Sequence, residues 1–161
     1  MENEYMQEKR NPRAEKRFVM AAKALSDSRM RNYPLELGGS NCPILVEGKR
    51  DRECLIKLGF KGLIELVNRG WSLDRLVTYL AEKWGKKNVN DSRGALILMM
   101  DWDRTGGRLQ RTLLTQFEAL DVKVDYNCRD VLLKCLKPET RTVEGMNSLT
   151  NNLLELMKQF N

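Results

Sequence analysis

Two short acidic segments carry the side chains that could do chemistry. Glu47 and Asp51 lie in the segment EGKRD, and Asp101 and Asp103 lie in the segment DWDRTGG. Each segment follows an apolar run, so each set of carboxylates is expected where a buried strand ends. Carboxylates that lie close together repel one another, and a hard divalent cation removes that cost. These residue types and positions predict a divalent-metal site.

Basic residues follow both acidic segments. On the predicted helix after Asp103, spacings of four and three residues place Arg104, Arg108 and Arg111 on one face. Basic side chains beside a metal could hold a phosphodiester backbone. A solvated helix face is an equally good interpretation for Arg108 and Arg111. The residues expected to contact nucleic acid are Lys49, Arg50, Arg52, Arg104, Arg108 and Arg111.

Composition excludes several kinds of chemistry. The chain has 161 residues and no histidine, which excludes a Ser-His-Asp triad, a Cys-His dyad and any His-ligated metal. Its four cysteines lack C-x-x-C spacing and are expected to be reduced thiols in or near the core: Cys42, Cys54, Cys128 and Cys135.

Charge and hydropathy bear on partners and location. The net charge of +6 favours an anionic partner. Nucleic acid ranks ahead of a membrane, because no stretch approaches the roughly 20 apolar residues of a spanning helix. The polar amino terminus lacks the pattern of a secretory signal, so a cytoplasmic protein is expected.

The elements that must position the acids alternate between strand and helix. Strands are predicted at 44–46, 63–67, 95–100 and 122–126, and helices at 51–58, 72–80 and 107–120. This alternation predicts one α/β domain with a parallel sheet covered on both faces. Ligands bind such sheets at the carboxyl ends of the strands, where Glu47, Asp101 and Asp103 are expected to meet. Trp102 is expected to point away from them, into packing.

Three segments are distinguished along the chain. Residues 1–41 are interpreted as a frayed basic tail, a helix in the second half of residues 1–31, and a linker over 32–40. Residues 42–136 form the core, and residues 137–161 form a loop and a helix over 148–160. The loop repeats the Glu-Gly pair at Glu144, but no apolar run precedes it. Arg141 and Glu144 are expected to approach the site. The apolar stripe of the last helix predicts core or dimer packing through Leu149, Leu153, Leu156, Met157 and Phe160.

The order strand-E-G-x-x-D, helix, strand, helix, strand-D-x-D-x-x-G resembles the TOPRIM domain, the metal-binding module of topoisomerases, primases and certain nucleases. The resemblance spans roughly Cys42 to Leu136 and rests on Glu47, Gly48, Asp51, Asp101, Asp103 and Gly106. It implies a three-layer α/β/α, Rossmann-like fold with a central parallel sheet of about four strands. It also implies Glu47 as general acid or base, Asp101 and Asp103 as ligands of Mg²⁺ or Mn²⁺, and Glu47 and Asp51 as further acids of the metal shell. The exit of the second strand, at 67–70, only loosely resembles the family's glycine-bearing turn.

The chain looks most like the small TOPRIM proteins, which include primase-like proteins and 5S ribosomal RNA maturases. It lacks the tyrosine domain of topoisomerases, the zinc module of primases and an ATP-binding loop. The leading hypothesis is a metal-dependent nuclease or RNA-processing enzyme acting on RNA or DNA, in which Lys49 and Arg104 hold phosphate beside Glu47. The alternative is a non-catalytic module that binds nucleic acid or a ribonucleoprotein, with a protein partner. Primase-like nucleotidyl transfer ranks third.

Overall fold

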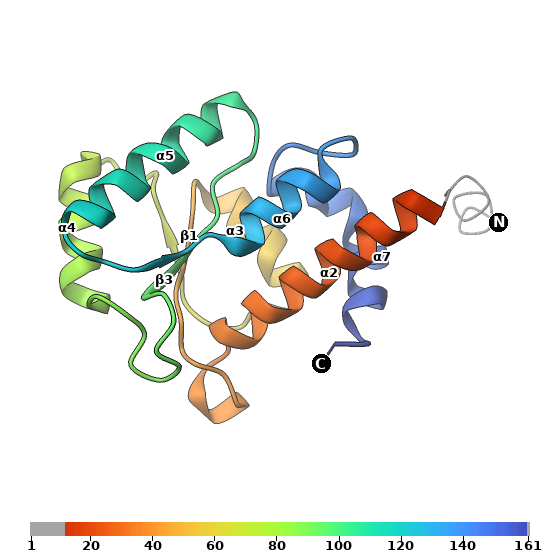
Figure 1. The fold of residues 1–161 in the computed structure, drawn as a ribbon, viewed down its shortest axis with the longest axis horizontal. Helices are drawn as coiled ribbons and strands as arrows, with labels where there is room; N and C mark the ends of the chain where they lie inside the picture. The colour runs from red at the N-terminus through yellow and green to blue at the C-terminus, as the bar shows by residue number, and fades with distance from the viewer. Residues whose placement is uncertain (1–11, 161) are drawn as a thin grey trace.

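The computed structural model describes residues 12–160 and has a four-stranded parallel sheet between two layers of helices (Figure 1). The strand order is β2-β1-β3-β4. This arrangement confirms the predicted three-layer α/β/α class. β1 has the predicted bounds, and the other three strands lie within their predicted ranges but are shorter: β1 is Ile44–Val46, β2 is Ile64–Leu66, β3 is Leu96–Leu98 and β4 is Val124–Asp125.

Helices connect these strands and extend both ends of the fold. Helices α4 and α5 cover one face of the sheet, and α2, α3, α6 and α7 cover the other (Figure 1). Their bounds are α2 Pro12–Asn32, α3 Lys49–Lys57, α4 Leu73–Trp84, α5 Arg104–Ala119, α6 Asn127–Leu136 and α7 Thr150–Met157. Two 3-10 helices, η1 Leu35–Leu37 and η2 Glu144–Leu149, complete the described elements.

The central strands are buried on both sides. Successive side chains of a strand point to opposite faces, so Ile44 and Ile97 enter the core beneath α2 and α6, while Leu45 and Leu96 enter the core beneath α4 and α5. Every residue from 95 to 100 is buried. The continuous apolar run before Asp101 therefore reflects a strand with a core on each side, as the sequence predicts.

The amino-terminal helix is longer than the sequence predicts. The predicted frayed tail falls partly on residues 1–11, which lie outside the described residues, but from Pro12 onward the chain is helical. Arg17 explains part of this extension, because its guanidinium pairs with Glu139 at 2.9 Å and donates to the Cys135 carbonyl at 2.6 Å. Helix α2 thus packs along α6 and α7 rather than fraying.

Two further elements differ from the sequence-based prediction. Helix α6 has no counterpart among the predicted elements, although Cys128, Leu132, Cys135 and Leu136 have helical spacing and are all buried. The predicted final helix over 148–160 is divided into η2 and the shorter α7. Its apolar stripe enters the core, as Leu153 and Met157 are fully buried, and all four cysteines are buried free thiols.

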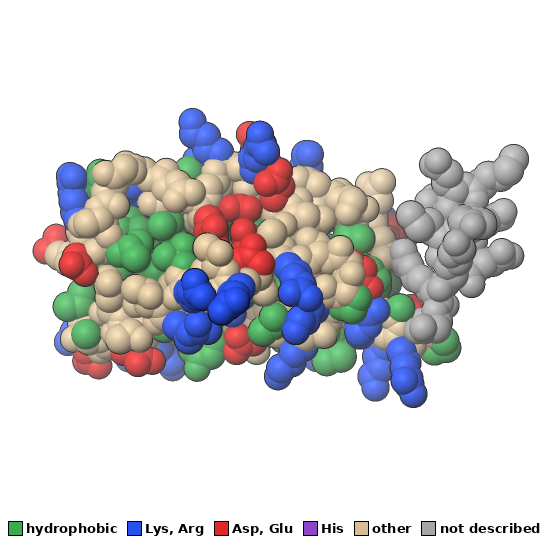
Figure 2. Space-filling model, turned by 90° about the horizontal axis from the view of Figure 1, so that it is seen from above, with side chains coloured by type: hydrophobic (Ala, Val, Ile, Leu, Met, Phe, Trp, Pro, Cys, Tyr) green, Lys and Arg blue, Asp and Glu red, His purple; other side chains and the backbone are tan. Residues whose placement is uncertain are grey.

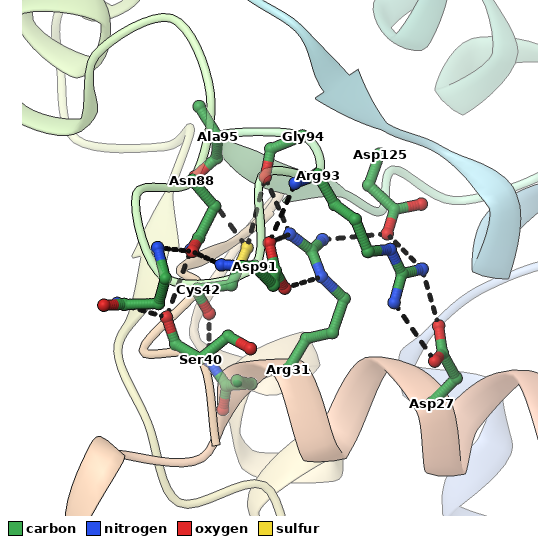
Figure 3. Close-up of polar contacts among 12 residues, drawn as sticks. Asp27, Arg31, Ser40, Cys42, Asn88, Asp91, Arg93, Gly94, Ala95 and Asp125 are labelled. Atoms are coloured by element: carbon green, nitrogen blue, oxygen red, sulfur yellow. Dashed lines mark hydrogen bonds and ion pairs between the residues drawn. The ribbon is translucent and has the colours of Figure 1, made fainter.

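A buried ion network ties α2 to the segment that leads into β3 and to β4 (Figure 3). Arg31 is only 3% exposed; its guanidinium pairs with Asp91 at 2.7 Å and Asp125 at 2.9 Å and donates to the Gly94 carbonyl. Burial opposes ionisation of Asp91, but hydrogen bonds from the Arg31 side chain, a backbone N–H and a hydroxyl hold its pKa at about 2. Arg93 extends the network outward to Asp27.

Replacing Arg31 by Met should destabilise the protein strongly, because the substitution removes a buried cation from two largely buried carboxylates, Asp91 and Asp125. We expect a loss of about 3 to 5 kcal/mol in the free energy of unfolding, measured by urea denaturation at neutral pH. The matched control is Arg93→Met, which removes a half-exposed arginine of the same network and should cost about 1 kcal/mol or less. Equal losses in the two variants would contradict this assignment.

Candidate functional site

The carboxyl ends of β1 and β3 bring the two acidic segments together. These strands are neighbours in the parallel sheet, with Leu45 opposite Leu98, so the chain leaves both strands at the same edge. A carboxylate oxygen of Glu47, Oε1, accepts a hydrogen bond of 3.2 Å from the backbone N–H of Asp101. Figure 2 views the molecule from above and shows acidic side chains gathered near the middle, with Lys and Arg side chains beside them.

Asp103 lies at the beginning of α5 and caps it. Its Oδ1 accepts a hydrogen bond of 2.7 Å from the Gly106 N–H, and α5 begins at Arg104. The prediction that this helix begins near Gly107 is therefore wrong by three residues, because Asp103 supplies an N-cap. Gly106 lies inside the first turn, where a Cβ atom would collide with the Asp101 carbonyl. The glycine is required by this close packing rather than by a sharp turn.

Asp51 is the third residue of α3 and is only 8% exposed. Its Oδ2 accepts a hydrogen bond of 3.0 Å from the N–H of Gly48, the residue that precedes α3. The backbone N–H of Glu144 also donates to this carboxylate. Asp51 therefore fixes the turn that follows Glu47 and contacts the carboxyl-terminal part of the chain.

Burial and mutual repulsion act on the acids together. Burial raises the pKa of Asp101 to about 7; the charges of Glu47, Asp51 and Asp103 add to this shift, and the Val143 N–H opposes it. Burial also raises the pKa of Glu47, with contributions from Asp51 and Asp103, against the Asp101 N–H and the Arg129 charge. The carboxylates thus share one electrostatic environment, in which added positive charge would be stabilising.

The segment before η2 closes one side of the site. The Val143 N–H donates to Oδ1 of Asp101 at 2.7 Å. Trp102, which is buried as predicted, donates from its backbone to the Arg141 carbonyl at 2.9 Å and from its indole to the Thr140 carbonyl at 2.7 Å. Arg50 lies 3.6 Å from Glu144. The Arg141 carbonyl and the Glu144 side chain thus contact residues of the two acidic segments.

Arg129 is a residue of the site that the sequence-based prediction missed. It lies on α6, is 7% exposed, and donates to the carbonyls of Met100 at 3.2 Å and Asp101 at 2.9 Å. Burial lowers the pKa of its guanidinium, and Asp101 and Asp103 act in the opposite direction. The helical spacing of the apolar residues around Arg129 indicates a helix whose inner face includes this arginine. This pattern in the sequence could have identified it.

The predicted basic residues lie on the two helices that begin at the acidic edge. Lys49 and Arg104 are the first residues of α3 and α5, so each sits at a helix amino terminus, where anions are favoured. Five of the six side chains are exposed and Arg52 is partly exposed: Lys49, Arg50, Arg52, Arg104, Arg108 and Arg111. Arg111 lies near Arg129, because a Cβ atom placed at Gly107 would be 3.7 Å from a guanidinium nitrogen of each of them.

The carboxylate oxygens of the site are ligands that suit a hard divalent cation. Within residues 12–160, however, no group of three or more Asp, Glu, Cys or His side chains is arranged to hold a metal ion. Asp51, Asp101 and Asp103 each direct one oxygen at a backbone N–H. These residues fit Mg²⁺ held by one or two carboxylates that completes its shell with water and phosphate oxygens, rather than an all-protein cage.

Asp101→Asn should stabilise the metal-free protein at alkaline pH. The pKa of Asp101 in the folded protein is about 7, above the ordinary value of 3.8, so the folded state holds the proton more tightly than the unfolded state. Protonation of Asp101 therefore stabilises the fold fully below about pH 4, and this stabilisation is lost as the pH rises through about 7. Asparagine keeps an Oδ1 acceptor for Val143 and removes the charge.

Urea denaturation in the presence of a chelator, at about pH 5 and about pH 8, measures this effect. The variant should be more stable than the unmodified protein at the higher pH and should vary less between the two. Glu53→Gln, which neutralises an exposed acid on α3, should leave the pH dependence unchanged. A variant with the original pH dependence would contradict the prediction.

Comparison with known proteins gives distant relatives. No family model matches the sequence. The chain is 28% identical over 120 residues to a UPF0292 protein of Methanocaldococcus jannaschii, covering 74% of this chain and 87% of the relative. It is 29% identical over 117 residues to a UPF0292 protein of Thermoplasma volcanium, covering 73% and 87%. A solved structure described as a putative protein from Aquifex aeolicus has a TM-score of 0.49 and 25% identity, covering 84% of this chain and 97% of that one.

These names state no activity, so function rests on the geometry of the site. None of the described helices combines the length and the apolar character that crossing a bilayer requires.

Proposed function

We propose that this chain is a TOPRIM-type enzyme that uses Mg²⁺ or Mn²⁺ to cleave phosphodiester bonds in nucleic acid, as a nuclease or RNA-processing enzyme. The observation that carries the proposal is the contact between Glu47 and the Asp101 backbone across β1 and β3. It places two acidic segments and two helix amino termini at the edge where α/β sheets bind ligands.

The roles follow from position and charge. Asp101 and Asp103 would hold the metal, with Asp51 and Glu47 completing the negative surroundings. A bound Mg²⁺ polarises a phosphoryl oxygen and lowers the pKa of a water molecule. Burial raises the pKa of Glu47, which brings this carboxyl closer to the range of an effective general acid or base. Glu47 would accept a proton from the attacking water or donate one to the leaving oxygen.

Basic side chains would hold the substrate. Lys49 and Arg104 each begin a helix beside the acids, so their charges add to those of the helix amino termini. Arg50, Arg52, Arg108 and Arg111 would extend the contact along the phosphate backbone without selecting a sequence. Arg129 holds the Met100 and Asp101 carbonyls and would position the metal-binding turn.

A non-catalytic nucleic-acid or ribonucleoprotein-binding module is the second candidate. The observation in its favour is that three aspartates already have structural partners: Asp51 and Asp103 accept from N–H groups at helix starts, and Asp101 accepts from Val143. This function predicts binding that weakens as salt increases, with no turnover. For either function, the buried free thiols are typical of a cytoplasmic protein.

The test begins with nucleic acid captured by the protein from native cell extract. The recovered RNA or DNA is sequenced, labelled and incubated with the protein in Mg²⁺, Mn²⁺ or chelator. We expect metal-dependent cleavage that falls by about 10² or more in Glu47→Gln and in Asp101→Asn. Glu53→Gln, an exposed neutralisation on α3, should retain activity.

Each outcome separates the candidates. Metal-dependent cleavage that survives both substitutions at the acids would contradict the proposed enzyme. Salt-sensitive binding without cleavage in any metal would favour the binding module instead. Urea denaturation of each variant distinguishes lost chemistry from lost folding.

A further inference from the structure

Cations and aromatic rings alternate on a second surface, at the outer edge of the sheet. A carboxylate anchors it: Glu65 of β2 is 8% exposed and accepts from Arg69 at 3.3 Å, from Lys83 at 3.3 Å and from the Trp84 indole at 3.2 Å. This anchor fixes two cations that would otherwise sample many conformations. We name the surface formed by Arg69, Trp71, Arg75, Tyr79 and Lys83 the Trp71 cluster.

Stacking contacts organise this cluster around Trp71. The Arg75 guanidinium carbon lies 4.1 Å from the Trp71 ring centroid, and that of Arg69 lies 5.2 Å from it. The Tyr79 ring meets Trp71 edge to face, with centroids 5.2 Å apart. Lys83 in turn lies 5.4 Å from the Tyr79 centroid. The result is a preformed series of planar groups and positive charges.

The Trp71 cluster begins at the edge of the sheet that carries the acids. Asn68 donates its backbone N–H to the Glu47 carbonyl at 2.9 Å, so the turn after β2 lies directly beside the turn after β1. Arg69, the next residue, donates to the Leu66 carbonyl at 2.7 Å, and Trp71 follows two residues later. A strand bound at the acids could therefore continue onto the cluster.

Charge and exposure distinguish this cluster from ordinary packing. Trp71 and Tyr79 stay partly exposed, and Arg75 is exposed. Arg69 and Lys83 share one carboxylate, Glu65, and among the described residues no salt bridge joins Arg75 to an acid. Packing alone would not require this excess of positive charge. A nucleic acid, which has anionic phosphates and planar bases, matches both the positive charge and the exposed planar groups.

We propose that the Trp71 cluster is a binding subsite for single-stranded nucleic acid. An unpaired base extends the stack on the Arg75 guanidinium, which lies over the Trp71 ring, and the adjoining phosphates contact Arg69 and Lys83. Arginine planes and aromatic rings stack on bases that are splayed out, whereas a duplex keeps its base faces covered. If the proposed function holds, this subsite defines the substrate class of the enzyme as a strand that is unpaired beside the scissile bond. This part of the inference rests on the proposed function.

Binding is measured without catalysis, by fluorescence anisotropy of labelled oligo-U and oligo-dT, and of a duplex of equal length, in chelator. Arg75→Gln and Trp71→Leu should each weaken single-strand binding by about tenfold and change duplex binding by less than about twofold. Lys83→Gln, at one of the proposed phosphate contacts, should reduce the slope of log affinity against log salt by about 0.7, the value for one lost phosphate contact on a single strand.

The matched control is Arg13→Gln, which removes one exposed arginine from α2 on the opposite face of the sheet. Equal weakening in Arg13→Gln and Arg75→Gln would overturn the subsite, because it would reflect net charge alone. Equal weakening for single strand and duplex would overturn it as well. Arg75 is exposed, so this variant remains informative even if Trp71→Leu unfolds.

Glu47→Gln separates this subsite from the proposed enzyme. If cleavage depends on Glu47 while Arg75→Gln and Trp71→Leu bind single strands normally, the subsite fails and the enzyme stands. If no cleavage occurs in any metal while both cluster variants lose single-strand binding, the subsite stands and the enzyme fails.

Discussion

Parallel pairing between β1 and β3 is the constraint on which the site depends. Both strands are apolar throughout and buried on both faces, so their register is fixed by two separate cores rather than one. Because they run in the same direction, the polar residues that follow each must emerge at the same edge. The Glu47 carboxylate and the Asp101 N–H meet there as a consequence of hydrophobic burial, without any attraction between the acids themselves.

Collecting acids at one buried edge has an electrostatic cost that the backbone offsets in part. The N–H groups of Gly48, Gly106 and Val143 each donate to one aspartate, and Asp101 has a further neighbour in the buried Arg129. These donors hold the side chains in place, yet the pKa of Asp101 is still raised to about 7. The fold therefore keeps its acids ordered while leaving them short of positive charge, a condition that a metal ion or the amino group of a ligand would relieve.

Local sequence patterns were enough to predict the sheet and the position of its acids. The apolar runs before Glu47 and Asp101 have the length and composition of buried strands, and alternation with helices implies parallel pairing. Local patterns do not predict features that depend on contacts between residues far apart in the sequence. Arg31 meets partners 60 and 94 residues away, which no local pattern indicates.

The missed features of the site have similar physical origins. Arg129 is absent from the predicted site because a charged residue on a helix is normally expected on the solvent side, and α6 is not among the predicted helices. The beginning of α5 was misplaced because Asp103 was considered only as a ligand, although the same carboxylate is a good N-cap. Gly106 belongs to the acidic motif, but its structural purpose is to provide room for the Asp101 carbonyl. In each case one residue serves a structural purpose that the motif alone does not reveal.

The contact from Val143 to Asp101 has a consequence for the order in which the protein is made. Asp101 leaves the ribosome 42 residues before the N–H group that holds it, and η2 and α7 must follow before the core beneath α2 is closed. Until then the nascent chain presents its apolar strands without their full cover. Synthesis of the acidic edge is thus separated from its completion, and the segment from Val143 through α7 determines when the site takes its final shape.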